Sequence, residues 1–195
     1  MRKHIIYLAA GSSRRFGENK LLRRMRGGCE MYRYGLEMLY HTACVREDTT
    51  LTVVTRYSAI WLETRIMPDL RTVMCHESEK GLSYTIRAGL DALGPLPPED
   101  FVVFAVADQP FLSNTTVHNL LDAAAPGVEA AAATCGKRRG NPVMFSAALV
   151  PELYALTGDQ GGREVLRRHP YVSVPVLSGR ELCDIDTPEA MKLLR

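Results

Sequence analysis

The sequence predicts a three-layer α/β domain in which helices cover both faces of a mostly parallel β-sheet. Apolar runs bounded by turn residues alternate along the chain with segments of helical period, and this alternation is typical of strands joined by crossover helices. The run FVVFAVA at 101–107 is apolar at every position, as expected for a strand buried on both faces. The chain has 195 residues, no internal repeat, and no linker beyond the connection GPLPPED at 94–100, so we expect one domain, 1–195.

The predicted elements follow from these runs in order. The strands are short apolar stretches that end at glycine, proline or polar residues, and they span 5–10, 51–55, 72–75, 101–107, 130–135 and 172–176. The helices occupy the intervals and span 30–43, 58–66, 82–93, 115–124, 147–155 and 162–168. In the third helix, Leu82, Ile86, Leu90 and Leu93 recur three or four residues apart and form one apolar stripe.

Two segments depart from the alternation. Residues 137–145, KRRGNPVMF, contain a turn and a short strand with no helix before them, which predicts a short antiparallel element in the sheet. Near the end of the chain, Asp186 or Thr187 is placed to cap a last short helix, with Pro188 in its first turn.

Composition and charge disfavour several classes of protein. Hydrophobic residues make up 46% of the chain and charged residues 24%, as in an ordinary soluble domain. The net charge of +2 gives no polyanion-binding signature, so no nucleic-acid partner is expected. The five cysteines are scattered without a C-x-x-C pair, which favours reduced thiols over a disulfide framework or a zinc site. The run 5–10 is too short for a signal peptide and no run could span a bilayer, so we expect a cytoplasmic protein without a membrane partner.

The loop 11–20 follows the first predicted strand and is rich in small and cationic residues, including Gly11, Arg14 and Lys20. In parallel α/β sheets ligands bind outside the carboxyl ends of the strands, and backbone N–H groups of such loops bind anions. This pattern predicts a polyphosphate-binding loop, although a solvated surface cluster would have the same charges. Gly11 and Gly17 are one residue too far apart for a Walker A loop, and Ser13 stands where a dinucleotide fingerprint needs glycine.

Three carboxylates are candidates for a metal site. Asp108 directly follows the apolar strand 101–107, and Asp184 and Asp186 lie two residues apart near the end of the chain. Carboxylate oxygens suit Mg²⁺, which takes one or two of them together with substrate phosphates. We expect Asp108 and one of the pair to bind Mg²⁺, although Asp186 is also placed to cap the last helix. The loop GDQGGR at 158–163 either wraps an anion or simply starts a helix.

Six segments in this order resemble the nucleotidyltransferases of molybdenum cofactor biosynthesis. They are LAAGSSRRFGENK at 8–20, GLSYTIRAGLDAL at 81–93, FAVADQPFL at 104–112, RGNPVMF at 139–145, GDQGGR at 158–163 and DIDTPEA at 184–190. The first is shared by many nucleotidyltransferases, whereas GDQGGR with DIDTP resembles the molybdenum cofactor cytidylyltransferases. The resemblance implies a Rossmann-like αβα nucleotidyltransferase fold and magnesium-dependent transfer of CMP from CTP to molybdopterin cofactor, with release of pyrophosphate. It also implies a molybdenum hydroxylase apoenzyme as the recipient of the product.

The resemblance also implies roles for individual residues. Catalysis falls to Arg14, Lys20 and Asp108, and the metal ligands are Asp108, Asp184 and Asp186. The nucleotide is held by Leu8, Ala9, Ala10, Gly11, Ser12, Arg14, Lys20, Gly81 and Ser83. The acceptor is held by Asn141, Pro142, Asp159, Gly161 and Arg163; Asn141 stands where the family often carries histidine and keeps hydrogen-bonding capacity.

Two alternatives remain at this point. The predicted nucleotide base, cytosine, depends on Ala10, because guanylyl-transferring relatives tend to carry glycine at this position. Sugar and terpenoid nucleotidyltransferases, however, also carry alanine there. The chain could therefore use GTP or act on a different phosphate. From another class, it could be a non-catalytic chaperone that holds the cofactor for a molybdenum hydroxylase. The joint presence of Arg14, Lys20, Asp108 and Asp186 favours an active enzyme.

Overall fold

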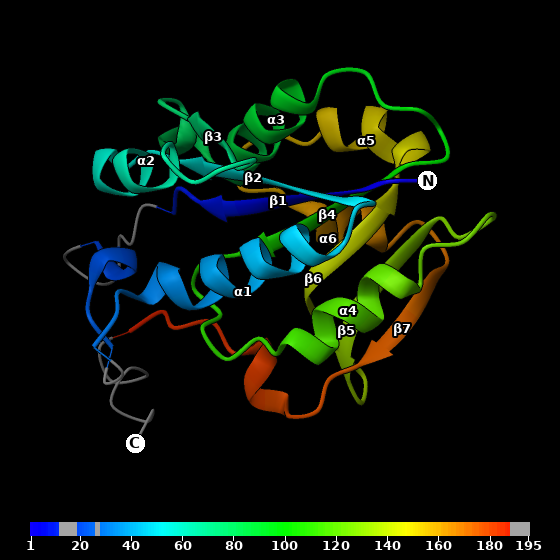
Figure 1. The fold of residues 1–195 in the computed structure, drawn as a ribbon. Coiled ribbons are helices and arrows are strands. Elements are labelled where there is room, and N and C mark those ends of the chain that lie inside the picture. Colours follow the sequence, from blue (N-terminus) through cyan, green and yellow to red (C-terminus); the bar gives the residue numbers. More distant parts are fainter. Residues whose placement is uncertain (12–18, 26–27, 188–195) are drawn as a thin grey trace.

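The computed structural model describes residues 1–11, 19–25 and 28–187 and shows the expected layered α/β architecture (Figure 1). A seven-stranded sheet has the order β3-β2-β1-β4-β6-β5-β7. The strands are β1 (Lys3–Ala9), β2 (Thr49–Thr55), β3 (Arg71–Met74), β4 (Phe101–Val106), β5 (Ala130–Cys135), β6 (Arg138–Ser146) and β7 (Tyr171–Pro175). The helices are α1 (Met31–Val45), α2 (Ser58–Thr64), α3 (Leu82–Leu93), α4 (Asn114–Asp122), α5 (Val150–Tyr154) and α6 (Gly162–Leu166). Short 3-10 turns lie at η1 (Lys20–Leu22), η2 (Ser78–Lys80), η3 (Ala147–Leu149) and η4 (Gly179–Leu182).

The predicted antiparallel element is strand β6. It pairs antiparallel with both β4 and β5, whereas the pairs β1–β2, β1–β4, β2–β3 and β5–β7 are parallel. Because β6 runs in the opposite direction, its first residues lie at the same edge of the sheet as the last residues of β1 and β4. The predicted fold class is therefore confirmed, with a reversed strand longer than the sequence pattern indicated.

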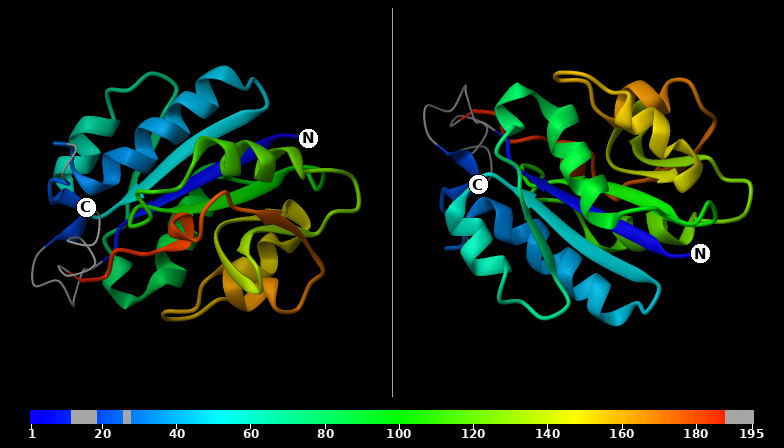
Figure 2. Two further views of the ribbon diagram at one scale, coloured as in Figure 1. Left: turned by 90° about the horizontal axis from the view of Figure 1, so that it is seen from below. Right: turned by 90° about the horizontal axis from the view of Figure 1, so that it is seen from above.

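Helices cover both faces of the sheet (Figures 1 and 2). Alternate residues of β1 point to opposite sides: Ile5 and Tyr7 join a core with α1 and α4, while Ile6 and Leu8 join a second core with α3, α5 and α6. The continuous apolar strands seen in the sequence reflect this double coverage. Among the described residues, no helix is long and apolar enough to span a bilayer.

The element boundaries differ from the predictions where polar residues or proline matter. Strand β1 begins at Lys3 rather than at residue 5, because the Lys3 ammonium pairs with Asp48 and the His4 ring with Thr50 and Asp100. The predicted helix 147–155 is a 3-10 turn followed by α5, which carries Pro151 in its first turn, where the missing N–H costs no hydrogen bond. The helix predicted after Asp186 lies outside the described residues.

Candidate active site

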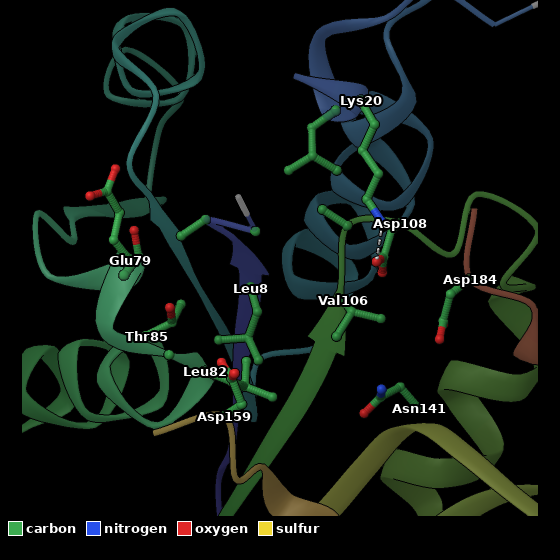
Figure 3. Close-up of a pocket in the computed structure, with 16 residues that line it drawn as sticks. Leu8, Lys20, Glu79, Leu82, Thr85, Val106, Asp108, Asn141, Asp159 and Asp184 are labelled. Carbon is green, nitrogen blue, oxygen red and sulfur yellow. Dashed lines mark hydrogen bonds and ion pairs between the residues drawn. The ribbon is translucent and has the colours of Figure 1, made fainter. Parts of the chain in front are cut away.

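A cavity of about 510 Å³ opens at the carboxyl ends of β1 and β4 (Figure 3). Its walls come from the end of β1, from η1, from the start of α3 and from the end of β4. The labelled side chains include Lys20, Asp108 and Asp184, with Leu8 and Val106 between the two sides of the opening (Figure 3). Several segments that are distant in the sequence and were predicted to carry function therefore meet at one edge of the sheet, where ligands bind in open α/β folds.

Lys20 joins two of the predicted metal ligands. Its Nζ donates to Asp108 Oδ2 at 2.8 Å and to Asp186 Oδ1 at 2.9 Å, and the residue is only 6% exposed. The Asn19 side chain caps η1 by accepting from the Leu21 N–H, which sets the start of the turn that carries Lys20. Burial alone would lower the pKa of Lys20, but attraction to the Asp108 carboxylate and hydrogen bonds to Asp108 and Asp186 outweigh it and raise the pKa. Lys20 therefore stays an ammonium ion at neutral pH.

The segment after η4 brings the other carboxylates to Asp108. The Ile185 N–H donates to the Asp108 carbonyl oxygen at 2.9 Å, so Asp184 and Asp186 flank the end of β4. Asp184 lines the cavity, and its Oδ1 accepts from Gln109 Nε2 at 2.7 Å. Burial and the negative charge of Asp108 raise the pKa of Asp184. The Asp108 and Asp184 carboxylates therefore repel one another when both are ionised.

The donor set fits a divalent cation that is also held by phosphates. Within residues 1–11, 19–25 and 28–187, no three His, Cys, Asp or Glu side chains are gathered closely enough to hold a metal ion by themselves. Mg²⁺ needs only one or two protein carboxylates when phosphate oxygens supply further ligands. Asp108 and Asp184 supply such oxygens at the cavity wall, and their mutual repulsion would be relieved by a cation.

The end of the first strand lines the cavity, and it takes part in hydrogen bonds that the sequence did not indicate. Leu8, Ala10 and Gly11 are lining residues. Ala9 is fully buried, and its carbonyl oxygen accepts from Thr55 Oγ1 at 3.0 Å. The Tyr57 hydroxyl donates to the Gly11 carbonyl oxygen at 2.5 Å. These bonds from the end of β2 hold the strand end in place; the predicted residues Ser12 and Arg14 lie outside the described residues.

Two of the glycine-containing motifs meet at the wall of the cavity. Gly81 has a φ of +129°, and a Cβ built on it would overlap the backbone of Gly158. The Ser83 N–H donates to the Gly158 carbonyl oxygen at 3.0 Å, and Ser83 itself is fully buried. Only glycine permits this approach, since φ is in the left-handed half of the map and no side chain fits. The segments at 81–93 and 158–163 therefore form one wall.

The predicted acceptor residues divide between two adjoining cavities. A smaller cavity of about 250 Å³ is lined by Gly161 and Arg163, and Asn141 lines both cavities. Asp159 lines only the larger one, and Pro142, which follows a cis peptide bond, is a lining residue of neither. Asn141 and Asp184 therefore mark the place where the two cavities meet.

Two residues of the site region were missed by sequence reasoning. Gln109 lines the smaller cavity and holds Asp184. Glu181 is 3% exposed and completes a capping box with Ser178 at the start of η4. Its second oxygen, Oε2, accepts from both the N–H and the hydroxyl of Ser113. The S-x-x-E pattern of a capping box was visible at 178–181, whereas nothing local marked Gln109.

Comparisons with known proteins identify the family of this chain. A family model described as MobA-like NTP transferase domain matches residues 5–174. The chain belongs to this family. The expected resemblance to molybdenum cofactor nucleotidyltransferases is therefore confirmed at the level of the family.

Two curated relatives and two solved structures extend over nearly the whole MobA-like chain. Purine catabolism protein PucB of Bacillus subtilis (strain 168) is 30% identical over 199 residues, which cover 97% of this chain and 94% of PucB. Nicotine blue oxidoreductase of Paenarthrobacter nicotinovorans is 28% identical over 195 residues, which cover 95% of this chain and 93% of that protein. Rv0371c from Mycobacterium tuberculosis H37Rv shares the fold with a TM-score of 0.77 at 24% identity, over 100% of this chain and 98% of that chain. Molybdopterin-guanine dinucleotide biosynthesis protein A from Archaeoglobus fulgidus shares the fold with a TM-score of 0.71 at 19% identity. The match covers 97% of this chain and 95% of that chain.

Proposed function

We propose that this MobA-like NTP transferase is a magnesium-dependent cytidylyltransferase that transfers CMP from CTP to molybdopterin cofactor. The observation that carries the proposal is the position of Lys20 between Asp108 and Asp186, in the lining of a cavity that Ala10 and Gly11, directly after β1, also line. An ammonium ion beside a cluster of carboxylates at the carboxyl edge of a parallel sheet suits a bound triphosphate. The motifs GDQGGR and DIDTP support the cytidylyl branch by resemblance.

The two adjoining cavities suggest how the substrates are placed. The larger cavity would hold CTP against Ala10, Gly11 and Gly81, and the smaller one would hold the acceptor near Arg163. Because both cavities include Asp184, the reacting phosphates would meet at this carboxylate. Holding two reactants in one orientation supplies much of the rate enhancement for phosphoryl-type transfers.

The reaction is an in-line displacement at phosphorus. An oxygen of the acceptor's terminal phosphate forms a new bond to the α-phosphorus of CTP, and the bond to the bridging oxygen breaks as pyrophosphate leaves. Lys20 would neutralise charge that develops on the departing phosphates, and Arg14 in the first loop would act alongside it. Mg²⁺, when bound to Asp108 and one of Asp184 and Asp186, would screen the negative charge of both phosphates.

The proposal also specifies the nucleotide base and the protein that receives the product. Ala10 lines the larger cavity, so its methyl group stands where guanylyl-transferring relatives tend to have glycine, and this supports CTP over GTP. A molybdenum hydroxylase apoenzyme would receive the product, which is consistent with a cytoplasmic site of action.

Pyrophosphate release tests this proposal directly. The protein is incubated with molybdopterin cofactor, Mg²⁺ and each common nucleoside triphosphate in turn, and we expect release with CTP and its loss when the metal is chelated. Asp108→Asn should reduce turnover by at least about 10³-fold, because it removes charge at the reacting centre. Asp69→Asn is the matched control, since Asp69 is an exposed residue with a φ of 56°, a conformation that asparagine tolerates.

The outcomes separate the alternatives. Release with GTP alone would exclude the cytidylyl assignment. Binding of the cofactor without release from any triphosphate would favour the chaperone. If Asp108→Asn kept near-full turnover while folding normally, the assignment of Asp108 to the reacting centre would be wrong.

A further inference from the structure

The smaller cavity has a lining that suits a heterocyclic ring. Its apolar walls are formed by the Phe104 ring and by aliphatic side chains such as Leu8 and Ile86. Its polar lining includes Gln109 and three arginines, namely Arg138, Arg139 and Arg163. Cavities of this kind bind a ring between apolar surfaces and orient it with a few polar groups. Of these polar groups, Arg138 donates to the Leu182 carbonyl oxygen at 2.6 Å, and the Arg139 guanidinium lies 5.4 Å from the centre of the Tyr171 ring.

Gln109 is the buried polar group of this cavity whose hydrogen bonding is incomplete. The residue is only 4% exposed. Its Nε2 donates to Asp184 Oδ1 at 2.7 Å, whereas its Oε1 is buried and has no hydrogen-bond partner. A carboxylate accepts hydrogen bonds but does not donate them, so Asp184 fixes which end of the amide is the nitrogen. The carbonyl end of the amide is thereby left for another donor.

An unpaired buried carbonyl is costly and calls for a specific explanation. The partner must be a hydrogen-bond donor, because Oε1 only accepts. A ligand that enters the smaller cavity and carries a ring N–H or an exocyclic amino group would supply this donor. Without such a donor, the ligand would bury the carbonyl of Gln109 unpaired, and sites of this kind reject analogues that lack the matching group.

We propose that Gln109 is a specificity-determining residue of the acceptor cavity, where its Oε1 accepts a hydrogen bond from an N–H donor of a pterin-type ring while its Nε2 orients Asp184. The inference rests on the proposed function for the identity of the acceptor. The same side chain then links recognition of the acceptor ring to the carboxylate at which the two cavities meet. A correct ring would pair the carbonyl and leave the amide nitrogen on Asp184.

Binding of two fluorescent bicyclic probes tests the recognition step without any turnover. Pterin carries ring N–H and amino donors on its pyrimidine ring, and 1,3-dimethyllumazine has the same bicyclic skeleton without these donors. We expect the wild-type protein to bind pterin about tenfold more tightly, as one hydrogen bond to a buried group would provide. Gln109→Met keeps the length of the side chain but removes both the carbonyl and the NH₂ group of the amide, so it should abolish this preference. Asn119→Leu also replaces an amide with an apolar side chain, but at an exposed position of α4 that lines neither cavity, so it should leave the preference unchanged.

A second variant separates recognition from the positioning of Asp184. Gln109→Glu keeps an acceptor oxygen but replaces the amide that donates to Asp184 with a second acid. We expect it to retain the pterin preference within about threefold and to lower kcat in the pyrophosphate-release assay with little change in the KM for CTP. Thermal melts and CTP binding show whether each variant is folded.

The inference is overturned if the wild-type protein binds neither probe or shows no preference between them. It is equally overturned if folded Gln109→Met keeps the preference. These outcomes can be distinguished from failure of the proposed function, which would appear as an absence of pyrophosphate release from the wild-type protein with every triphosphate.

Discussion

Glu181→Gln should destabilise the protein far more than an ordinary surface substitution. The Oε1 atom of Glu181 accepts from the N–H groups of Leu177 and Ser178, at 2.9 and 3.2 Å, and Oε2 accepts from the N–H and hydroxyl of Ser113, at 3.0 and 2.7 Å. In glutamine one of the two oxygens becomes an NH₂ group that cannot accept. The least costly orientation points this group at Ser113, whose hydroxyl can rotate and accept from it, while the Ser113 N–H loses its partner.

The magnitude follows from these contacts. Losing one hydrogen bond to a buried charge costs about 1.5–3 kcal/mol, and the remaining bonds weaken because the charge is gone. Since Glu181 is only 3% exposed, water compensates little of this loss. We expect the free energy of unfolding to fall by about 3 kcal/mol, which corresponds to a drop in Tm of roughly 6–12 °C for a chain of this size.

Urea and thermal unfolding of the wild-type protein, Glu181→Gln and Glu99→Gln would measure this effect. Glu99 is an exposed glutamate, so the same substitution there should change the free energy of unfolding by less than about 0.5 kcal/mol. The hydrogen bonds hold the pKa of Glu181 below its usual value despite its burial. The stability advantage of the wild-type protein over Glu181→Gln should therefore be complete above about pH 4.5. It should be lost as the pH falls through the lowered pKa of Glu181. A loss below about 1 kcal/mol at pH 7 would refute this account.

Further predictions concern backbone geometry and a histidine. Gly81→Ala should destabilise the protein by more than about 2 kcal/mol, because a Cβ there would overlap the facing backbone. Gly127 has a φ of +83° with open space around it, so Gly127→Ala should cost only about 1 kcal/mol of backbone strain. Equal losses of stability in the two variants would contradict the packing argument. The hydrogen bond to Glu129, with that to Glu152, raises the pKa of His169 despite partial desolvation. The stability advantage over His169→Gln should thus be largest at about pH 5–6.5 and disappear as the pH rises through the raised pKa, so unfolding curves that differ most at pH 9 would contradict it.

Local patterns in the sequence were sufficient to predict most of the sheet and its helices. Strand β5 and helix α3 have the predicted limits, because apolar periodicity ends abruptly at turn residues there. The start of β1 was missed, since Lys3 and His4 look exposed in the sequence and become buried only through partners at the start of β2 and just before β4. Hydropathy cannot report a polar residue that is paired across the sheet.

The site shows the same division between local and long-range information. Asp108 could be placed from sequence because a side chain directly after a buried parallel strand lies at the ligand-binding edge. The role of Gln109 could not be predicted from the sequence, since its partner Asp184 lies 75 residues away. Only the folded chain brings the two side chains together. Similarly, the contact between Gly81 and Gly158 turns two apparently separate glycine motifs into one wall.

The reversed direction of β6 has a consequence for how the smaller cavity can change in evolution. The tight turn at Gly136 between β5 and β6 lies at the same edge of the sheet as the cavities, and Arg138, Arg139 and Gly140 line the smaller one directly after it. Residues inserted at this turn would lengthen the cavity wall while the paired strands below kept their register. A single hairpin thus offers a place where the size of the smaller cavity can change without any change to β1 and β4, whose ends line the larger one.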